Sequence, residues 1–315
     1  MTALVETILF VFSLVALGYA CGRSGYLKPD IGEGVSAFAV NVAMPLLLFR
    51  TMIGADFNGA APWRFWGVYF ASVIVAWTAG HLITTRIFGR DSQAGVVGGV
   101  SSAFSNLVLL GIPFILGVLG QPGFEVLSLL ISIHLPIMIM ASIIMFEVFG
   151  GSDEAVQPLR IVRTFLLKMA VNPLIVAIIF GQIWRATGFA MPALPMRLVD
   201  ALANTAGPVA LFAMGLSLCR FGISGNVRPA LVLSGVKLLL MPAVALCLAW
   251  LVGLSPLTAK VAVAAAALPS GVNSYLIAIQ FGTGQALASN QMTIATALAA
   301  LSTAFWLLLA QFIFG

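Results

Sequence analysis

Long runs of apolar residues, separated by short polar segments, extend over almost the whole chain. A helix needs about 20 apolar residues to cross the hydrocarbon part of a bilayer. This pattern predicts ten membrane-spanning helices at roughly 3–22, 34–53, 63–87, 94–119, 124–149, 160–185, 197–219, 229–253, 257–281 and 286–314. The segments between them are short, so we expect an all-α membrane protein without a soluble domain.

Two of the expected spans carry polar residues beside helix-breaking residues near their centres. The span at 94–119 contains SNLVLLGIP, with Ser105, Asn106, Gly111 and Pro113. The span at 257–281 contains LPSGVNSY, with Pro269, Ser270, Gly271, Asn273 and Tyr275. Each pattern predicts a helix that is interrupted inside the membrane.

A short motif also recurs in the two halves of the chain. NVAMPLLLF begins at Asn41 and NTAGPVALF begins at Asn204, and both fit N-x-A-x-P-x-x-L-F. If the halves repeat, each has five spans, and an odd number places them in the membrane in opposite orientations. We therefore expect two inverted five-helix repeats, residues 1–149 and 160–315, joined by a short cytoplasmic linker at 150–159. Inverted repeats with interrupted helices are typical of secondary transporters.

The interruptions indicate where a substrate would bind. Unpaired backbone groups cost several kcal/mol in hydrocarbon, so broken helices persist only inside protein or beside a water-filled cavity. The N-terminal ends of the half-helices there carry bare amides and a partial positive charge, which suits a carboxylate. We expect a binding site for a small organic anion where the spans at 94–119 and 257–281 cross.

Composition agrees with a membrane protein. Hydrophobic residues make up 61% of the chain and charged residues 8%, against about 25% charged in soluble domains. The basic residues, which in a soluble protein would suggest nucleic acid, lie mostly in the short loops. The two His and the scattered acids have no metal-ligand spacing, and no cofactor motif is present.

The distribution of Lys and Arg predicts the orientation. Loops after the odd-numbered spans up to the seventh contain Arg23, Lys28, Arg86, Arg90, Arg160, Arg163, Lys168, Arg220 and Arg228. The alternate loops contain Arg50, Arg64, Arg185, Arg197 and Lys260. Cytoplasmic loops are the richer in Lys and Arg, so both termini are expected on the non-cytoplasmic side of the membrane.

SNLVLLGIP resembles the fourth-span motif of the auxin efflux carrier family, in which an Asn precedes Gly-Ile-Pro. The LPSGVN stretch, the motif at Asn41 and the ten-span layout are also similar to that family, over essentially the whole chain. The resemblance implies unwound, crossing fourth and ninth spans, a scaffold and a transport domain that move in an elevator-like cycle, and often a homodimer. It also implies organic anions as substrates, including auxin, malonate and malate.

The candidate site residues each have a structural alternative. Asn106 and Asn273 are expected to bind the substrate, although a buried Asn can also steady a kink. Ser105, Ser270 and Tyr275 are further candidates that could instead bond back to helix carbonyls or pack. Asn41 and Asn204 could line the site or stabilise the kinks at Pro45 and Pro208. Gly111, Pro113, Pro269 and Gly271 are expected to shape the crossing.

Ionisable residues inside the membrane are functional candidates. His134 could relay protons, because its pKa range suits that role, or simply pack. Lys237 could pair with an anion, reach toward the membrane surface or bind a carbonyl. H+ is therefore a candidate coupling ion.

The sequence favours a secondary transporter of mono- or dicarboxylates over three alternatives. A sodium-coupled bile-acid-type symporter shares the crossing plan but would need acidic ligands, and neither interrupted span contains Asp or Glu. An intramembrane enzyme would need a paired catalytic group, such as Ser with Lys. A non-transporting membrane sensor would bind the ligand without moving it.

Overall fold

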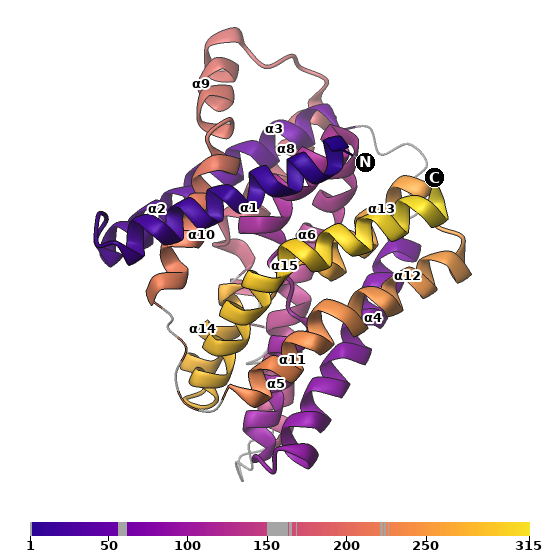
Figure 1. Cartoon of the computed structure of the whole chain (residues 1–315). Coiled ribbons are helices and arrows are strands. Elements are labelled where there is room, and N and C mark those ends of the chain that lie inside the picture. Colours follow the sequence, from indigo (N-terminus) through magenta and orange to yellow (C-terminus); the bar gives the residue numbers. More distant parts are fainter. Residues whose placement is uncertain are drawn as a thin grey trace.

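The computed structural model describes residues 2–55, 62–149, 163, 166–167, 169–220, 223, 225 and 227–315. Every regular element within these residues is a helix (Figure 1). The expected linker at 150–159 lies outside the described residues, as do Arg160 and Lys168.

The first half contains α1 (Thr2–Arg23), α2 (Pro29–Phe38), α3 (Met44–Gly54), α4 (Pro62–Leu82), α5 (Ser92–Ala103) and α6 (Ile112–Phe149). The second half contains α8 (Pro173–Thr187), α9 (Ala193–Ala203), α10 (Ala206–Arg220), α11 (Arg228–Gly235), α12 (Met241–Val252), α13 (Pro256–Ala267), α14 (Val272–Gln280) and α15 (Gln285–Phe314). Four π-helical turns adjoin them: η1 (Ala39–Ala43), η2 (Ile83–Ile87), η3 (Leu107–Gly111) and η4 (Val236–Leu240).

Seven stretches of the described residues are helical, long and apolar enough to cross a membrane. They are Leu4–Arg23, Asp30–Gly54, Pro62–Ile87, Leu107–Phe149, Ala193–Cys219, Arg228–Val252 and Gln285–Phe314. Pro173–Thr187 and Pro256–Ala267 are shorter apolar helices. The chain is therefore a helical, multi-pass membrane protein.

Proline explains three of the π-helical turns. A proline has no N–H, so the carbonyl four residues before it cannot be paired in the usual α-helical way. The turns η1, η3 and η4 end two residues before Pro45, Pro113 and Pro242, where the i→i+5 pattern takes over locally.

Gly120 explains why α6 covers parts of two of the expected spans. Gly120 has φ 67° and ψ −167°, a conformation open essentially to glycine alone. It separates a short helix, 112–119, from a long one, 121–149, in the place where the sequence predicts a turn between spans.

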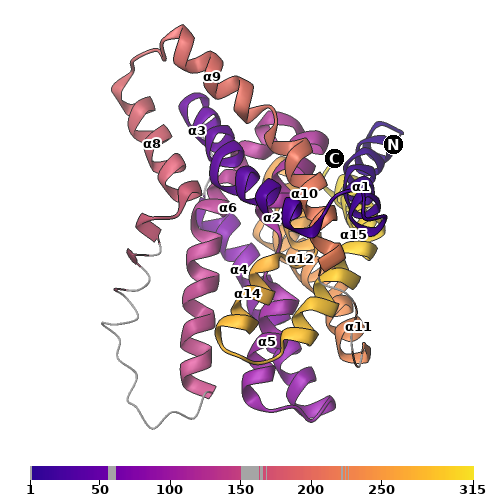
Figure 2. The ribbon, with the colours of Figure 1, turned by 90° about the vertical axis from the view of Figure 1, so that its left-hand side faces the viewer.

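The helices pack in two groups. The first helix group comprises α1, α2, α3, α8, α9 and α10, and the second comprises α4, α5, α6 and α11–α15. Figures 1 and 2 show α1, α2 and α10 lying together, whereas α4, α5 and α11 lie at the other side of the molecule. The two chain ends lie close together in both views.

Within the first helix group, α1 and α10 touch backbone to backbone. A Cβ added to Gly18 would lie 2.1 Å from the Phe212 carbonyl oxygen, and one added to Gly215 would lie 2.0 Å from the Val15 carbonyl oxygen. Small residues permit such close approach of membrane helices. This contact holds α10 against α1. On another side, α10 packs against η3 and α6.

Candidate functional site

The two interrupted helices meet at their breaks. The chain leaves α5 at Phe104 and α13 at Leu268, and Ser105 pairs with Ser270 in an antiparallel β-bridge. The Asn106 N–H donates to the Pro269 carbonyl at 2.9 Å. The Gly271 N–H donates to the Phe104 carbonyl at 3.2 Å. Each break thus satisfies backbone groups that the other break leaves without a helical partner.

Asn106 stabilises the helix that resumes after the first break. Its Oδ1 accepts a hydrogen bond from the Leu109 N–H at 3.2 Å, which caps the start of η3. Its Nδ2 lies 3.5 Å from the Met214 sulfur on α10. Asn106 therefore connects the crossing to the first helix group.

A cavity with two lobes lies beside the crossing, between the two helix groups. Lobe A has a volume of about 350 Å³ and lobe B about 300 Å³. Both lobes are lined by Val40, Asn106, Leu109, Val272 and Leu276. Helices α2, α10 and α14 line lobe A, while η1, α6, α8 and α14 line lobe B.

Most of the predicted substrate-binding residues lie at this cavity. Tyr275 lines lobe A, and Asn106 lines both lobes. Asn41, Ser105 and Asn273 line lobe B. The cavity therefore brings three of the four predicted asparagines together.

Ser270 and Asn204 lie elsewhere. Ser270 is fully buried behind the crossing, with its hydroxyl within hydrogen-bonding distance of the Gln291 Oε1 and the Ser101 carbonyl. Asn204 lies between α9 and α10 and accepts a hydrogen bond from Arg50. Neither residue lines the lobes.

The four residues predicted to shape the crossing lie at or next to it. The Gly111 N–H donates to the Asn106 carbonyl at 2.9 Å, and Pro113 lies in the first turn of the helix that follows, α6. Pro269 accepts from Asn106 as described above. A Cβ added to Gly271 would lie 3.3 Å from the Asn106 Cα, so a side chain at this position would press on the crossing.

Lys237 lies behind the crossing and does not line the lobes. It is fully buried, and its Nζ donates to the Ala266 carbonyl at 2.6 Å, in the last turn of α13. The Nζ also lies 3.3 Å from the Met241 sulfur. The sequence left open whether Lys237 pairs with an anion, reaches toward the membrane surface or binds a carbonyl. In the structure it binds a carbonyl. The Nζ therefore lies at the C-terminal end of α13, where backbone carbonyls lack a helical partner.

His134 on α6 lines lobe B and is 3% exposed. Its ring centroid lies 5.0 Å from that of Phe104 and 5.5 Å from that of Tyr69. The imidazole therefore packs directly against the first break while facing the cavity.

Asn172 belongs to the cavity, although sequence reasoning missed it. It lines lobe B, and its Oδ1 accepts from the Leu174 N–H at 3.0 Å and the Ile175 N–H at 3.3 Å. An Asn directly before a Pro is a signature of a helix N-terminus, so its capping role was readable. Its place at the cavity depends on how α8 packs, which the local sequence does not encode.

The lobes combine apolar walls with neutral polar groups. Amides and hydroxyls converge on them, and the charged residue among their lining is Glu33 on α2. Within the described part of the chain, no three His, Cys, Asp or Glu side chains gather in a way that could hold a metal ion. Such a site suits a small molecule recognised by neutral donors.

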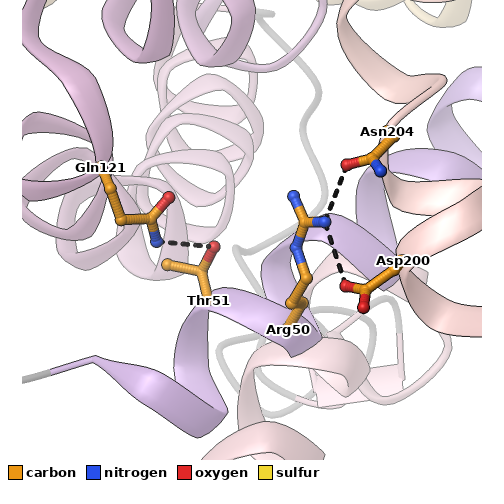
Figure 3. Close-up of polar contacts among 5 residues, drawn as sticks. All are labelled: Arg50, Thr51, Gln121, Asp200 and Asn204. Atoms are coloured by element: carbon orange, nitrogen blue, oxygen red, sulfur yellow. Dashed lines mark hydrogen bonds and ion pairs between the residues drawn. The ribbon is translucent and has the colours of Figure 1, made fainter. Parts of the chain in front are cut away.

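A second polar cluster lies at the far ends of α3 and α9 (Figure 3). The Arg50 Nη1 donates to the Asn204 Oδ1 at 2.8 Å and to the Asp200 Oδ1 at 3.2 Å. The Gln121 amide, just past the turn at Gly120, lies 3.5 Å from the Thr51 hydroxyl.

Comparison with known proteins places the chain in a transporter family. Residues 3–307 match the family described as "Membrane transport protein". An "Uncharacterized transporter" of Methanothermobacter thermautotrophicus is 25% identical, over 96% of both chains. A "Putative malonate transporter" of Rhizobium meliloti is 27% identical, over 95% of this chain and 93% of that protein. "Auxin efflux carrier component 8" of Arabidopsis thaliana is 23% identical, over 85% of this chain and 86% of that protein.

The resemblance to the auxin efflux carriers noted from the motifs is thus confirmed. The family and the relatives identify a transport protein rather than an enzyme. With a match that covers nearly its whole length, the chain belongs to the membrane transport protein family, which includes the auxin efflux carriers.

Proposed function

We propose that this chain is a secondary transporter of small organic anions, mono- or dicarboxylates, that binds its substrate in the two-lobed cavity. The observation that carries the proposal is the meeting of two broken helices beside a cavity that contains Asn106 and Asn273. Broken helices that face a polar cavity are the usual substrate site of secondary transporters. The relative named "Putative malonate transporter" supports a carboxylate.

The carboxylate would be held mainly by neutral donors. The amide of Asn273 faces lobe B from the first turn of α14, whose N-terminal amides also lie at the crossing. Helix N-termini stabilise anions through these amides and the partial positive charge. The apolar lining would contact the carbon skeleton of the substrate.

Alternating access would involve movement between the two helix groups. The cavity lies at their boundary, where the first helix group would act as the scaffold and the second as the transport domain.

In this proposal the chain is two inverted repeats of five spans, with both ends on the non-cytoplasmic side of the inner membrane. The nearness of the chain ends supports an even number of spans. H+ is the proposed coupling ion and a homodimer the proposed assembly.

Uptake of [¹⁴C]malonate into proteoliposomes tests the function, together with the thermal stability of the detergent-solubilised protein across a panel of carboxylates. A ligand that binds the folded state raises its unfolding temperature, by an amount that grows with concentration. We expect malonate or another small carboxylate to raise it, and the same compound to be transported.

The Asn273→Ala variant ties the result to the cavity. We expect it to lose at least about tenfold in affinity, since a site built to hydrogen-bond a ligand depends strongly on each partner. Gln280→Ala, an exposed change at the end of the same helix, is the control and should behave as the parent. Stabilisation by a carboxylate without uptake would indicate a sensor, and uptake that requires Na⁺ would indicate a sodium symporter. Normal binding by Asn273→Ala would refute the site.

A further inference from the structure

Another cavity lies farther along the helix that follows the first break. Its volume is about 240 Å³, and it is bounded by α1, α3, the start of α6 and the segment from α9 into α10. Pro113 and Leu116 line it from α6, and Arg50 and Asn204 line it from the first helix group. We call it the Arg50 cavity.

The Arg50 cavity and lobe A lie at different levels along α10. Met214 and Ser217 of α10 line lobe A, whereas Gly207 and Leu211 line the Arg50 cavity. Contact between α10 and the broken helix closes the space between them. A Cβ added to Gly207 would lie 3.4 Å from the Pro113 Cβ, and Asn106 touches Met214. The two cavities therefore share the same pair of walls but lie at different levels.

The two cavities carry opposite charges. Among the residues that line the lobes the charged one is Glu33, whereas the Arg50 cavity is lined by a guanidinium. The neighbouring cavity, which shares Thr7 and Gly117 with it, is lined by Lys260. An anion that passes the crossing would thus move from neutral amides toward positive charge.

The contacts of Arg50 leave room for exchange of a carboxylate. Its bonds to Asp200 and Asn204 both come from Nη1, so Asp200 does not hold the guanidinium through the two-nitrogen fork (Figure 3). Arginine binds carboxylates best through that fork. The side chains of Arg50 and Asp200 are 25% and 42% exposed, and ion pairs this exposed contribute little to the stability of a protein.

We propose that Arg50 forms a second anion-binding site, which takes the carboxylate of the substrate on the far side of the crossing. There the substrate carboxylate replaces Asp200 as the partner of the guanidinium, while Asn204 keeps the side chain in place. The inference rests on the proposed function for the identity of its ligand. It assigns to Asn204 a role in positioning Arg50, away from the crossing where the sequence placed it.

Cysteine labelling tests the site without need of the substrate. Leu116→Cys places a thiol in the Arg50 cavity, and Leu276→Cys places a matched thiol in the two lobes. Both are made in a background in which Cys21, Cys219 and Cys247 are replaced by alanine. Each variant is reacted with an anionic and a cationic methanethiosulfonate reagent, MTSES and MTSET, and the ratio of the two rate constants is measured.

We expect Arg50→Gln to lower the MTSES/MTSET ratio at the Leu116→Cys thiol by about tenfold, because a fixed positive charge concentrates anions locally. The ratio at the Leu276→Cys thiol should not change. Arg50→Lys should keep most of the ratio, and Asp200→Asn should raise it, since the competing carboxylate is gone. If Arg50→Gln does not fold, the ratio in Asp200→Asn serves as the test of whether the guanidinium attracts anions. An unchanged ratio in the folded variants overturns the proposal.

Malonate protection then tests the ligand. Malonate should slow MTSES labelling of Leu116→Cys when Arg50 is present and should not do so in Arg50→Gln. Protection that survives Arg50→Gln would overturn the assignment to Arg50. Absence of malonate uptake by the parent protein contradicts the proposed function instead, and it is measured separately from the reagent ratio.

Discussion

The two breaks at the crossing pair with each other through one antiparallel bridge but are held by different side chains. At the first break, Asn106 caps the following helix and also lines both lobes of the cavity. At the second break, residues that do not line the cavity support the backbone. Lys237 donates to the Ala266 carbonyl, and Ser270 contacts Gln291. At the first break one residue both caps a helix and lines the cavity, whereas at the second break different residues support the backbone and line the cavity.

This difference predicts that the first break is the more sensitive to a single substitution. Removal of Asn106 takes away a helix cap and a cavity amide together. At the second break, removal of Asn273 takes away a cavity amide alone, and removal of Lys237 takes away a support alone.

Asn106→Ala should have the largest effect. We expect [¹⁴C]malonate uptake at background and a lower unfolding temperature, because loss of an N-cap costs about 1 kcal/mol. Asn106→Asp is the informative comparison, since its carboxylate still accepts from the Leu109 N–H but repels an anion. It should keep the thermal stability and lose uptake. Parental uptake by Asn106→Asp would show that the amide does not contact the substrate.

The positions of the breaks could be read from the sequence because they depend on local chemistry. Proline lacks the N–H that a helix needs, and Gly271 sits where a side chain would press on Asn106. Inside a membrane such residues are tolerated only where other groups form hydrogen bonds to the freed backbone N–H and C=O groups. Because two spans each contain such a break, the sequence indicated that the two breaks meet.

The surroundings of each polar side chain could not be read in the same way. Asn41 and Asn204 occupy the same place in a shared motif, yet Asn41 lines lobe B and Asn204 binds Arg50. The sequence likewise left three possible partners open for Lys237. The structure shows that its partner is a backbone carbonyl 29 residues away along the chain. These outcomes depend on how helices distant in sequence pack, which a motif does not contain.

Lys237→Met should have an intermediate effect. The side chain keeps its approximate length, but the Ala266 carbonyl at the end of α13 loses its hydrogen-bond donor, and a typical hydrogen bond contributes about 0.5–1.5 kcal/mol to stability. We expect the second break to shift and uptake to fall by about tenfold, with the protein still monodisperse on size exclusion. Since Lys237 does not line the lobes, the loss should appear in the transport rate more than in malonate affinity.

Lys28→Met is the matched control for Lys237→Met. Lys28 is an exposed lysine directly before α2, and it is not among the residues that line the lobes or the Arg50 cavity. This variant should take up malonate at the parental rate. Equal losses in both variants would mean that removal of any lysine side chain, rather than loss of support at the break, causes the effect.

His134→Gln should have the smallest effect on uptake at equal pH and a specific effect on coupling. The imidazole packs on Phe104 at the first break and faces lobe B, and the second break has no corresponding histidine in the described part of the chain. If it carries the coupling proton, uptake driven by a pH gradient should fall to the rate measured without a gradient, because glutamine cannot be protonated in its place. Malonate binding and exchange should stay near the parental values, since the polar side chain is retained. Gradient-driven uptake that persists in His134→Gln would remove His134 from the coupling and leave it as a packing residue of the first break.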